Sequence, residues 1–220
     1  MSDYTTRFIQ LAIQAKALQF GEFILKSGRI SPYFFNAGVF HTSIQIASLA
    51  SCYADAVDQS GLRFDVIFGP AYKGIPLATA LACEYAKRQR DVAIAFNRKE
   101  VKDHGEGGRI VGADLNARRI LIIDDVITAG TAIRQSISMI RTSGGEVAGI
   151  VVALDRQEIN VSTDRRSAIQ AIAQSEQIPI IAIATLKNLL TYSQTDNNLT
   201  PHFSPLQAYQ TRYCVIDSKQ

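Results

Sequence analysis

"RILIIDDVITAGTA", residues 119–132, places a run of aliphatic residues before two adjacent acids and a short run of small and hydroxylated residues. The aliphatic run shows no polar alternation, which is typical of a strand buried on both faces of a parallel sheet. In open sheets of this kind, ligands bind at the carboxyl ends of the strands, where loops lead into helix N-termini. The stretch therefore predicts a ligand site beside Asp124 and Asp125.

Short β-branched runs with the same character occur elsewhere, and helical patterns separate them. They begin near residues 66, 92, 147 and 178. Apolar residues at helical spacing follow the first run and follow the acidic strand, and the second of these helices should end at Gly144-Gly145. This alternation predicts an α/β fold with a mostly parallel central sheet flanked by helices.

The N-terminal part of the chain has a different pattern. Apolar residues recur at helical spacing from Phe8 to Leu18 and again from Ile46 to Val57. Between them, "FGEFILKSGRISPYFFNAG", residues 20–38, has strand-like apolar residues interrupted at Ser27-Gly28, which predicts a hairpin outside the main sheet. We expect a small N-terminal hood over residues 1–40 and a core over residues 41–220.

Composition and charge limit the classes of partner. The chain has 220 residues, of which 47% are apolar, enough for one sizeable core. Its 23 basic and 20 acidic residues leave a formal charge of +3, too small an excess to indicate nucleic acid or a membrane surface. The sequence has no signal-like N-terminus and no membrane-length apolar run, so we expect a cytoplasmic protein. Cys52, Cys83 and Cys214 lie far apart, without histidines at metal-ligand spacing, which predicts buried, reduced thiols.

The residues after the two acids indicate what the ligand is. The "TAGT" run, residues 128–131, offers backbone N–H groups with little steric bulk and leads into the next helix, as in anion-binding loops. Carboxylates beside such a loop would repel a simple phosphate. A ligand with a phosphate at one end and sugar hydroxyls at the other removes the conflict, because the acids can accept hydrogen bonds from the hydroxyls. The pattern therefore predicts a phosphoribosyl group.

Two other nucleotide-binding patterns do not fit. An aliphatic run that ends in acids also occurs in the magnesium-binding strand of P-loop ATPases, but G-x-x-x-x-G-K-[ST] occurs nowhere in this chain. "GEGGRI", residues 105–110, has Ile110 where a dinucleotide-binding turn has its last glycine, and it follows no predicted strand.

The stretch 119–132 resembles the phosphoribosyl-diphosphate-binding motif of type I phosphoribosyltransferases, and this resemblance implies their fold. It also implies a set of contacts to that cosubstrate, namely Asp124, Asp125, Val126, Ile127, Thr128, Ala129, Gly130, Thr131 and Ala132. A second strand-to-helix turn lies in "FDVIFGPAYKGIPLA", residues 64–78. In the family this position is the diphosphate loop, which implies that Tyr72 and Lys73 bind diphosphate oxygens.

The connection from Asn97 to Arg118 has too few apolar residues to bury a helix face. Connections of more than about 12 to 15 residues without regular structure are usually functional lids or disordered segments. "RKEVKDHGEGG", residues 98–108, resembles the catalytic lid of orotate phosphoribosyltransferases, which closes over the diphosphate of the neighbouring subunit. The resemblance implies a flexible lid over residues 97–118 and a homodimer with shared active sites. The implied diphosphate ligands in the lid are Arg98, Lys99, Lys102 and His104.

"LKSGRISPYFFNAG", residues 25–38, resembles the orotate-binding region of the same enzymes. It implies that Lys26 lies near both substrates and that Phe34 and Phe35 lie along the pyrimidine, with Thr128 also in contact. Because adjacent residues of an extended segment face opposite ways, only one of the two rings can enter a core. Arg156 follows the fourth strand of the predicted sheet, where a guanidinium can pair with the carboxylate of orotate.

The resemblance thus implies an orotate phosphoribosyltransferase, a pentosyltransferase of pyrimidine (UMP) biosynthesis that joins orotate to phosphoribosyl diphosphate. Its catalytic residues would be Lys73, Lys102, His104, Asp124 and Asp125. The Mg²⁺ cofactor would be held mainly by the diphosphate, without a direct protein ligand. Two alternatives stay open: a purine phosphoribosyltransferase, and a regulator that binds phosphoribosyl diphosphate without catalysis. The sequence indicates neither the acceptor of the orotate N1 proton nor a role for residues 187–220.

Overall fold

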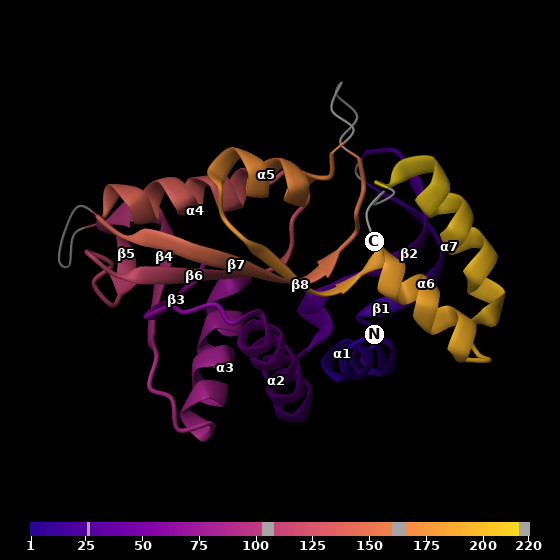
Figure 1. The fold of residues 1–220 in the computed structure, drawn as a ribbon, viewed down its shortest axis with the longest axis horizontal. Coiled ribbons are helices and arrows are strands. Elements are labelled where there is room, and N and C mark those ends of the chain that lie inside the picture. Colours follow the sequence, from indigo (N-terminus) through magenta and orange to yellow (C-terminus); the bar gives the residue numbers. More distant parts are fainter. Residues whose placement is uncertain (26, 103–107, 160–165, 216–220) are drawn as a thin grey trace.

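The computed structural model describes residues 1–25, 27–102, 108–159 and 166–215 (Figure 1). Its main sheet has six strands in the order β5-β4-β3-β6-β7-β8. Their bounds are β3 Val66–Gly69, β4 Ala93–Lys102, β5 Gly108–Gly112, β6 Arg119–Val126, β7 Glu146–Asp155 and β8 Ile180–Thr185. Every neighbouring pair is parallel except β4 and β5. The predicted α/β fold with a mostly parallel sheet is confirmed.

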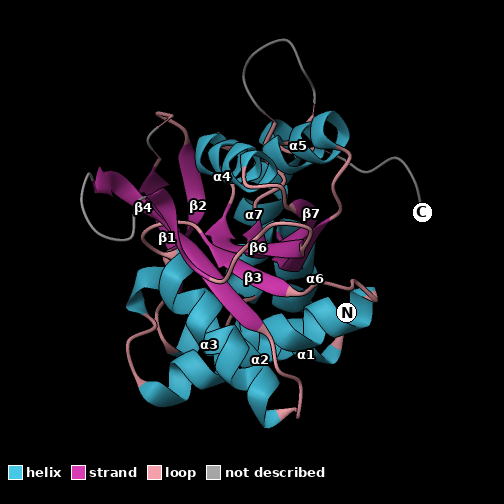
Figure 2. Ribbon diagram, turned by 90° about the vertical axis from the view of Figure 1, so that its left-hand side faces the viewer, coloured by secondary structure: helices cyan, strands magenta, loops and turns pink. Residues whose placement is uncertain are grey.

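Helices cover both faces of this sheet (Figures 1 and 2). One face carries α1, α2 and α3, and the other carries α4 and α5. Of the remaining helices, α7 lies beside the N-terminal hairpin, and α6 contacts α7 and β8. The bounds are α1 Asp3–Gln14, α2 Ser43–Ser60, α3 Gly74–Lys87, α4 Thr131–Thr142, α5 Ala168–Glu176, α6 Leu186–Thr195 and α7 Thr200–Tyr213, with a short 3₁₀ helix η1 at Ala37–Val39. Within the described ranges, no helix has the length and apolar content needed to cross a bilayer.

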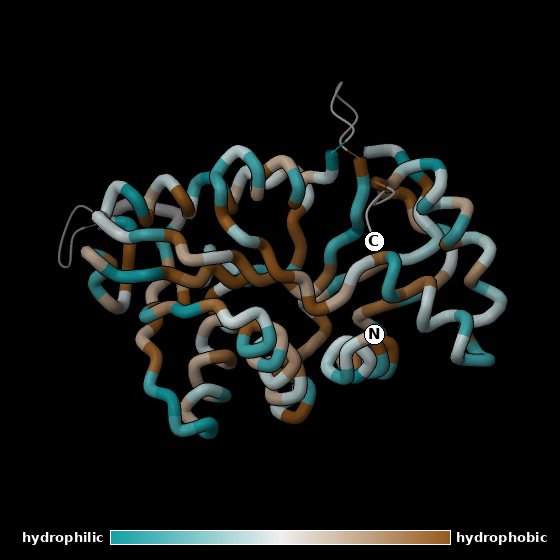
Figure 3. Tube along the Cα trace, viewed as in Figure 1, coloured by the Kyte–Doolittle hydropathy of each residue, from teal (hydrophilic) through white to brown (hydrophobic). Residues whose placement is uncertain are grey.

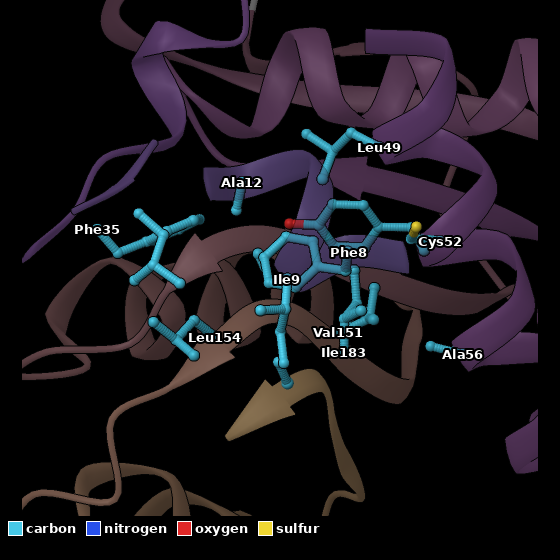
Figure 4. Packing of buried hydrophobic residues seen from close by; sticks show 14 of the residues in the cluster. Phe8, Ile9, Ala12, Phe35, Leu49, Cys52, Ala56, Val151, Leu154 and Ile183 are labelled. Atoms are coloured by element: carbon cyan, nitrogen blue, oxygen red, sulfur yellow. The ribbon is translucent and has the colours of Figure 1, made fainter. Parts of the chain in front are cut away.

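Strand β6 shows why the central strands lack polar alternation. Leu121 and Ile123 belong to the apolar cluster under α1, α2 and α3, whereas Ile120 and Ile122 belong to the cluster under α4 and α5. Successive side chains of a strand point to opposite faces, so a strand covered on both sides needs apolar residues throughout. Brown segments run along the middle of the sheet in Figure 3, and Figure 4 shows the first cluster around Phe8.

The predicted N-terminal hairpin is confirmed as β1, Leu18–Ile24, paired antiparallel with β2, Ile30–Phe35. The first helix is shorter than its apolar spacing predicted. It ends at Gln14, and Leu18 begins β1, because Lys16 takes a left-handed conformation with φ of 57°. The boundary between residues 40 and 41 stays a prediction, and the cluster around Phe8 holds side chains from both sides of it.

Two other predictions need correction. The segment after Asn97 has regular structure in its described part, since β4 extends to Lys102 and pairs with β5. A hairpin at the edge of a sheet satisfies its backbone hydrogen-bonding groups by cross-strand pairing, so it needs less apolar surface than a helix. Here Ile110 packs against the cluster under α4 and α5. Cys83 is exposed on α3, so only Cys52 and Cys214 are buried thiols.

Candidate active site

The two acids at the end of β6 are fixed by their own strand. Oδ1 of Asp124 accepts a hydrogen bond of 2.9 Å from the backbone N–H of Asp125, and Oδ1 of Asp125 accepts one of 2.9 Å from Val126. From the opposite side, the hydroxyl of Tyr53 donates to the Asp124 carbonyl at 2.8 Å. Oδ2 of Asp125 then accepts from Nζ of Lys73 at 2.7 Å. Both carboxylates are therefore held in place without a ligand.

Burial raises the pKa of Asp124 to about 6, and the neighbouring charge of Asp125 adds to this shift. The backbone hydrogen bond from Asp125 and the charge of Lys73 act in the opposite direction. The carboxylate of Asp124 is consequently ionised at neutral pH but loses its charge on mild acidification.

The loop from β6 to α4 is open on the side where a ligand would bind. Thr128, Ala129, Thr131 and Ala132 are exposed. Gly130 precedes α4 in a left-handed conformation with φ of 76°, and no side chain caps the helix. The first backbone N–H groups of an uncapped helix have no partner within the helix, so they are available to an anion. Of the other two predicted contacts, Ile127 is buried and Val126 is partly buried.

The turn from β3 to α3 forms a second tight loop. A Cβ atom on Gly69 would lie 2.3 Å from the carbonyl oxygen of Gly74, so the two backbones meet where no side chain fits. The backbone N–H of Ala71 donates to Oδ1 of Asn97 at 2.9 Å, which ties the loop to β4. Tyr72, which belongs to this loop, is 68% exposed. Sequence reasoning missed Asn97, whose place at the sheet edge, one residue after the apolar run of β4, could have indicated it.

Lys73 connects the two loops, since it is the N-cap residue of α3 and its ammonium group reaches the end of β6. Its side chain is 55% exposed, whereas that of Asp125 is 7% exposed. The side chain of Lys73 is therefore accessible from outside, while its ammonium contacts a buried acid. This contact brings the predicted diphosphate loop and the predicted ribose-binding acids into one site.

Arg156 lies at the same edge of the sheet. Leu154 pairs with Val126 across β7 and β6, so Arg156 follows at the level of Thr128. The guanidinium stacks over the ring of Tyr33 at 4.3 Å and donates through Nη2 to Oγ of Ser31 at 3.0 Å. It also donates through Nε to Oε1 of Glu158 at 2.7 Å. Sequence reasoning missed Ser31 and Tyr33 because they come from the distant hairpin. It also missed Glu158, which lies two residues after Arg156.

Phe34 and Phe35 face opposite ways, as expected of adjacent residues on a strand. The ring of Phe35 is buried and lies 5.9 Å from that of Phe8. The ring of Phe34 is 38% exposed and stacks on Phe23 at 5.5 Å. Of the two predicted pyrimidine contacts, only the Phe34 ring is thus accessible to a ligand.

Several predicted site residues cannot be placed with the others. Lys26 and His104 lie outside the described residues. Lys99 and Lys102 belong to β4, but their side chains lie outside the described part. Arg98, also in β4, is partly buried. The roles of these five residues stay predictions.

Comparison with known proteins agrees with this geometry. A family model described as a phosphoribosyl transferase domain matches residues 42–169. An orotate phosphoribosyltransferase of Stenotrophomonas maltophilia (strain K279a) is 59% identical over 215 residues, which cover 98% of each chain. One of Xylella fastidiosa (strain 9a5c) is 61% identical over 213 residues and covers 97% of each chain. The crystal structure of the Francisella tularensis orotate phosphoribosyltransferase has a TM-score of 0.84 and 40% identity, covering 94% of this chain and 99% of that one. Sequence, fold and site together show that this chain belongs to the orotate phosphoribosyltransferase family.

Proposed function

We propose that this chain transfers the ribose 5-phosphate group of phosphoribosyl diphosphate to orotate, giving orotidine 5′-monophosphate and diphosphate in pyrimidine biosynthesis. The observation that carries the proposal is the ion pair of Lys73 with Asp125, which joins two phosphate-type loops in one site. Arg156 at the same edge adds a group that recognises the carboxylate of orotate.

The reaction breaks the bond between C1 of the ribose and the diphosphate oxygen. The N1 atom of orotate forms the new bond to C1 and gives up its proton to the solvent. Positive charge develops on the ribose and negative charge on the departing diphosphate. Asp124 and Asp125 would hold the ribose hydroxyls and oppose the positive charge. Lys73 and the backbone of Tyr72 would stabilise the diphosphate, since preorganised groups aimed at developing charge lower the barrier most. The uncapped start of α4 would bind the 5-phosphate.

Mg²⁺ fits this site as a cation that arrives with the substrate. Among the described residues, no group of three His, Cys, Asp or Glu side chains could hold a metal ion. The carboxylate of Asp124 is a hard oxygen donor of the kind Mg²⁺ accepts, and Asp125 is already engaged by Lys73. The diphosphate oxygens would therefore supply most ligands, and the ion would neutralise charge on the leaving group.

The lid cations Arg98, Lys99, Lys102 and His104 would act across a homodimer. The support for this part is the resemblance of residues 98–108 to the family's lid, together with the position of the hairpin that carries it. Strands β4 and β5 lie at one edge of the sheet, and the β1–β2 hairpin lies toward the other end of the molecule (Figure 1). Ser31 of this hairpin accepts a hydrogen bond from Arg156. A neighbouring subunit would then present its own lid to this site.

The test is consumption of orotate, followed by its ultraviolet absorbance. Orotate should disappear only when phosphoribosyl diphosphate and Mg²⁺ are both present, because an unshielded diphosphate is a poor leaving group. Adenine, guanine, hypoxanthine and uracil serve as control bases under the same conditions. Turnover of a purine in place of orotate would contradict the assigned base, and binding of phosphoribosyl diphosphate without turnover of any base would indicate a regulator.

A further inference from the structure

Glu158 is the centre of a hydrogen-bonded network that lies behind Arg156. Its Oε1 atom accepts from Nε of Arg156 at 2.7 Å and from the hydroxyl of Tyr209 at 2.7 Å. Nη2 of Arg156 also lies 2.7 Å from this oxygen. Oε2 lies 3.8 Å from Nη1 of Arg29. One carboxylate thus connects the end of β7 to the hairpin and to α7.

The segment around Glu158 is also held by its backbone. The N–H of Ile159 donates to the carbonyl of Tyr213 at 2.8 Å, and the N–H of Val215 donates to the carbonyl of Gln157 at 2.9 Å. Arg29 donates through Nη2 to the carbonyl of Ile159 at 2.9 Å. The residues that follow α7 therefore pair with the residues that follow Arg156. This gives the C-terminal part of the chain a structural link to the site.

These contacts fix the plane of the Arg156 guanidinium and leave one of its edges available. Nε and Nη2 are engaged by Glu158 and Ser31, and Tyr33 covers one face. Among the described residues, none accepts a hydrogen bond from Nη1. A free arginine side chain would lose much rotamer freedom on binding a ligand, and this group has already lost it.

Burial and, to a smaller extent, the hydrogen bond to Glu158 raise the pKa of Tyr209 to about 12. At neutral pH the hydroxyl therefore stays protonated and donates to the carboxylate. Glu158 has a side chain that is 21% exposed, and its Oε1 atom receives donors from both sides. The orientation of Glu158 is thus set by Tyr209 as well as by Arg156.

We propose that Glu158, oriented by Tyr209, is a positioning residue that sets the affinity for orotate by holding the Arg156 guanidinium in its binding orientation. This inference rests on the proposed function, in which Arg156 pairs with the orotate carboxylate. It assigns α7, which contains no predicted site residue, a part in the recognition of the base. Glu158 acts by geometry, through its oxygen as an acceptor, and its negative charge is not required.

The test compares orotate KM and phosphoribosyl diphosphate KM in three variants. Glu158→Ala should raise orotate KM by roughly 5- to 20-fold, because a hydrogen bond to a charged group is lost and the arginine becomes mobile. Glu158→Gln keeps an acceptor oxygen and should stay within about twofold of wild type. Tyr209→Phe, which removes only a hydroxyl, should raise orotate KM by roughly two- to fivefold. Phosphoribosyl diphosphate KM and kcat should change little in all three.

Tyr213→Phe is the matched control, because it removes a hydroxyl from the next turn of α7 that makes no described hydrogen bond to Glu158. Its orotate KM should equal that of wild type. In an Arg156→Ala background, Glu158→Ala should have no further effect on orotate KM, since the two residues act as a unit. A residue that only stabilises the fold would instead add its effect in both backgrounds and raise both KM values.

The outcomes separate the inference from the function on which it rests. If Arg156→Ala raises orotate KM but Glu158→Ala and Tyr209→Phe do not, only the inference is overturned. If Glu158→Gln behaves like Glu158→Ala, or if either lowers orotate KM, the charge of Glu158 acts and the positioning role is wrong. If the wild-type chain does not consume orotate, or if Arg156→Ala leaves its KM unchanged, the proposed function or its carboxylate contact has failed.

Discussion

Nζ of Lys73 lies 2.7 Å from Oδ2 of Asp125, so a cation from the proposed diphosphate loop is paired with an acid of the proposed ribose-binding strand. The pair joins the turn before α3 to the end of β6, which are the two halves of the proposed cosubstrate site. Because Lys73 is more than half exposed and Asp125 is almost fully buried, a bound diphosphate can meet the ammonium without breaking the pair. Removing either partner should therefore affect both loops.

Replacing Lys73 tests this coupling. Lys73→Gln should lower kcat by roughly 100-fold, the usual effect of removing one group that meets transition-state charge, and should raise phosphoribosyl diphosphate KM. Lys87→Gln is the matched control, because Lys87 is an exposed lysine at the other end of the same helix. Steady-state kinetics with saturating orotate would measure both effects. Equal activity of the two variants would exclude Lys73 from the chemistry.

The raised pKa of Asp124 predicts an acid limb in the pH profile. Below a pH of about 6 the carboxyl group becomes neutral and loses its attraction for a ribose that gains positive charge, so kcat/KM for phosphoribosyl diphosphate should fall. The second ionisation of the substrate phosphate, near pH 6, contributes to the same limb. In Asp124→Asn the substrate phosphate still ionises but the carboxyl group is gone, so the acid limb of its pH profile should be shallower. In Lys73→Gln the limb should move to higher pH, because Lys73 lowers the pKa of Asp124.

The same pKa predicts a cost in stability. Since the pKa is raised from 3.8 to about 6, the folded chain binds this proton more tightly than the unfolded chain, and stability falls as pH rises through that window. Asp124→Asn should therefore be more stable than wild type at neutral pH, by on the order of 1 to 3 kcal/mol. The difference should shrink toward zero near pH 4. Urea unfolding at several pH values would measure it, with the exposed Asp91→Asn as control.

Gly130 should not tolerate a side chain. A Cβ atom there would lie 2.5 Å from Cδ1 of Ile172, and the residue has a φ of 76°. Gly130→Ala should lower the free energy of unfolding by about 1 to 3 kcal/mol and raise phosphoribosyl diphosphate KM. Gly61→Ala carries the same conformational strain, with φ of 69°, but its Cβ would meet no atom within 4 Å. It should lose about 1 kcal/mol of stability with no change in KM.

Mixing two inactive variants tests the shared active site. Lys102→Ala removes a lid cation and Asp124→Asn alters the pocket, so each homodimer should be slow by roughly 100-fold. After subunit exchange at equal amounts, about half of the dimers are mixed, and one of their two sites has an intact pocket and an intact lid. Activity should rise to about a quarter of wild type. If native mass spectrometry confirms exchange and activity stays low, the lid works within its own subunit.

Local patterns predicted where the elements around the proposed cosubstrate site begin and end. Consecutive residues were enough to predict three features: the end of β6, the start of α4 near Thr131 and the turn before α3. Each depends on a strand pattern, a glycine or a helix start, and these are local properties of the sequence. The family resemblance, and not the residue pattern, identified orotate.

Features that depend on distant pairing were not predicted. The β4–β5 hairpin depends on Phe96 meeting Val111, and no single window of sequence records that contact. The partners of Arg156 lie as far away as Ser31, 125 residues earlier. Leu18 fits a helical period as well as a strand, and the left-handed Lys16 decides between them. Periodicity describes one segment at a time, so it does not predict contacts between segments.

The N-terminal hairpin and α7 both support Arg156, and this has a consequence for redesign. The proposed loops for phosphoribosyl diphosphate are continuous pieces of the sheet edge, whereas the arginine is held directly by the N-terminal hairpin and, through Glu158, by α7. A chimaera that takes its hairpin from a relative with another base preference would keep a working cosubstrate half and lose half of the supports of the arginine. Grafting a new specificity onto this scaffold would therefore require both termini to be exchanged as one unit.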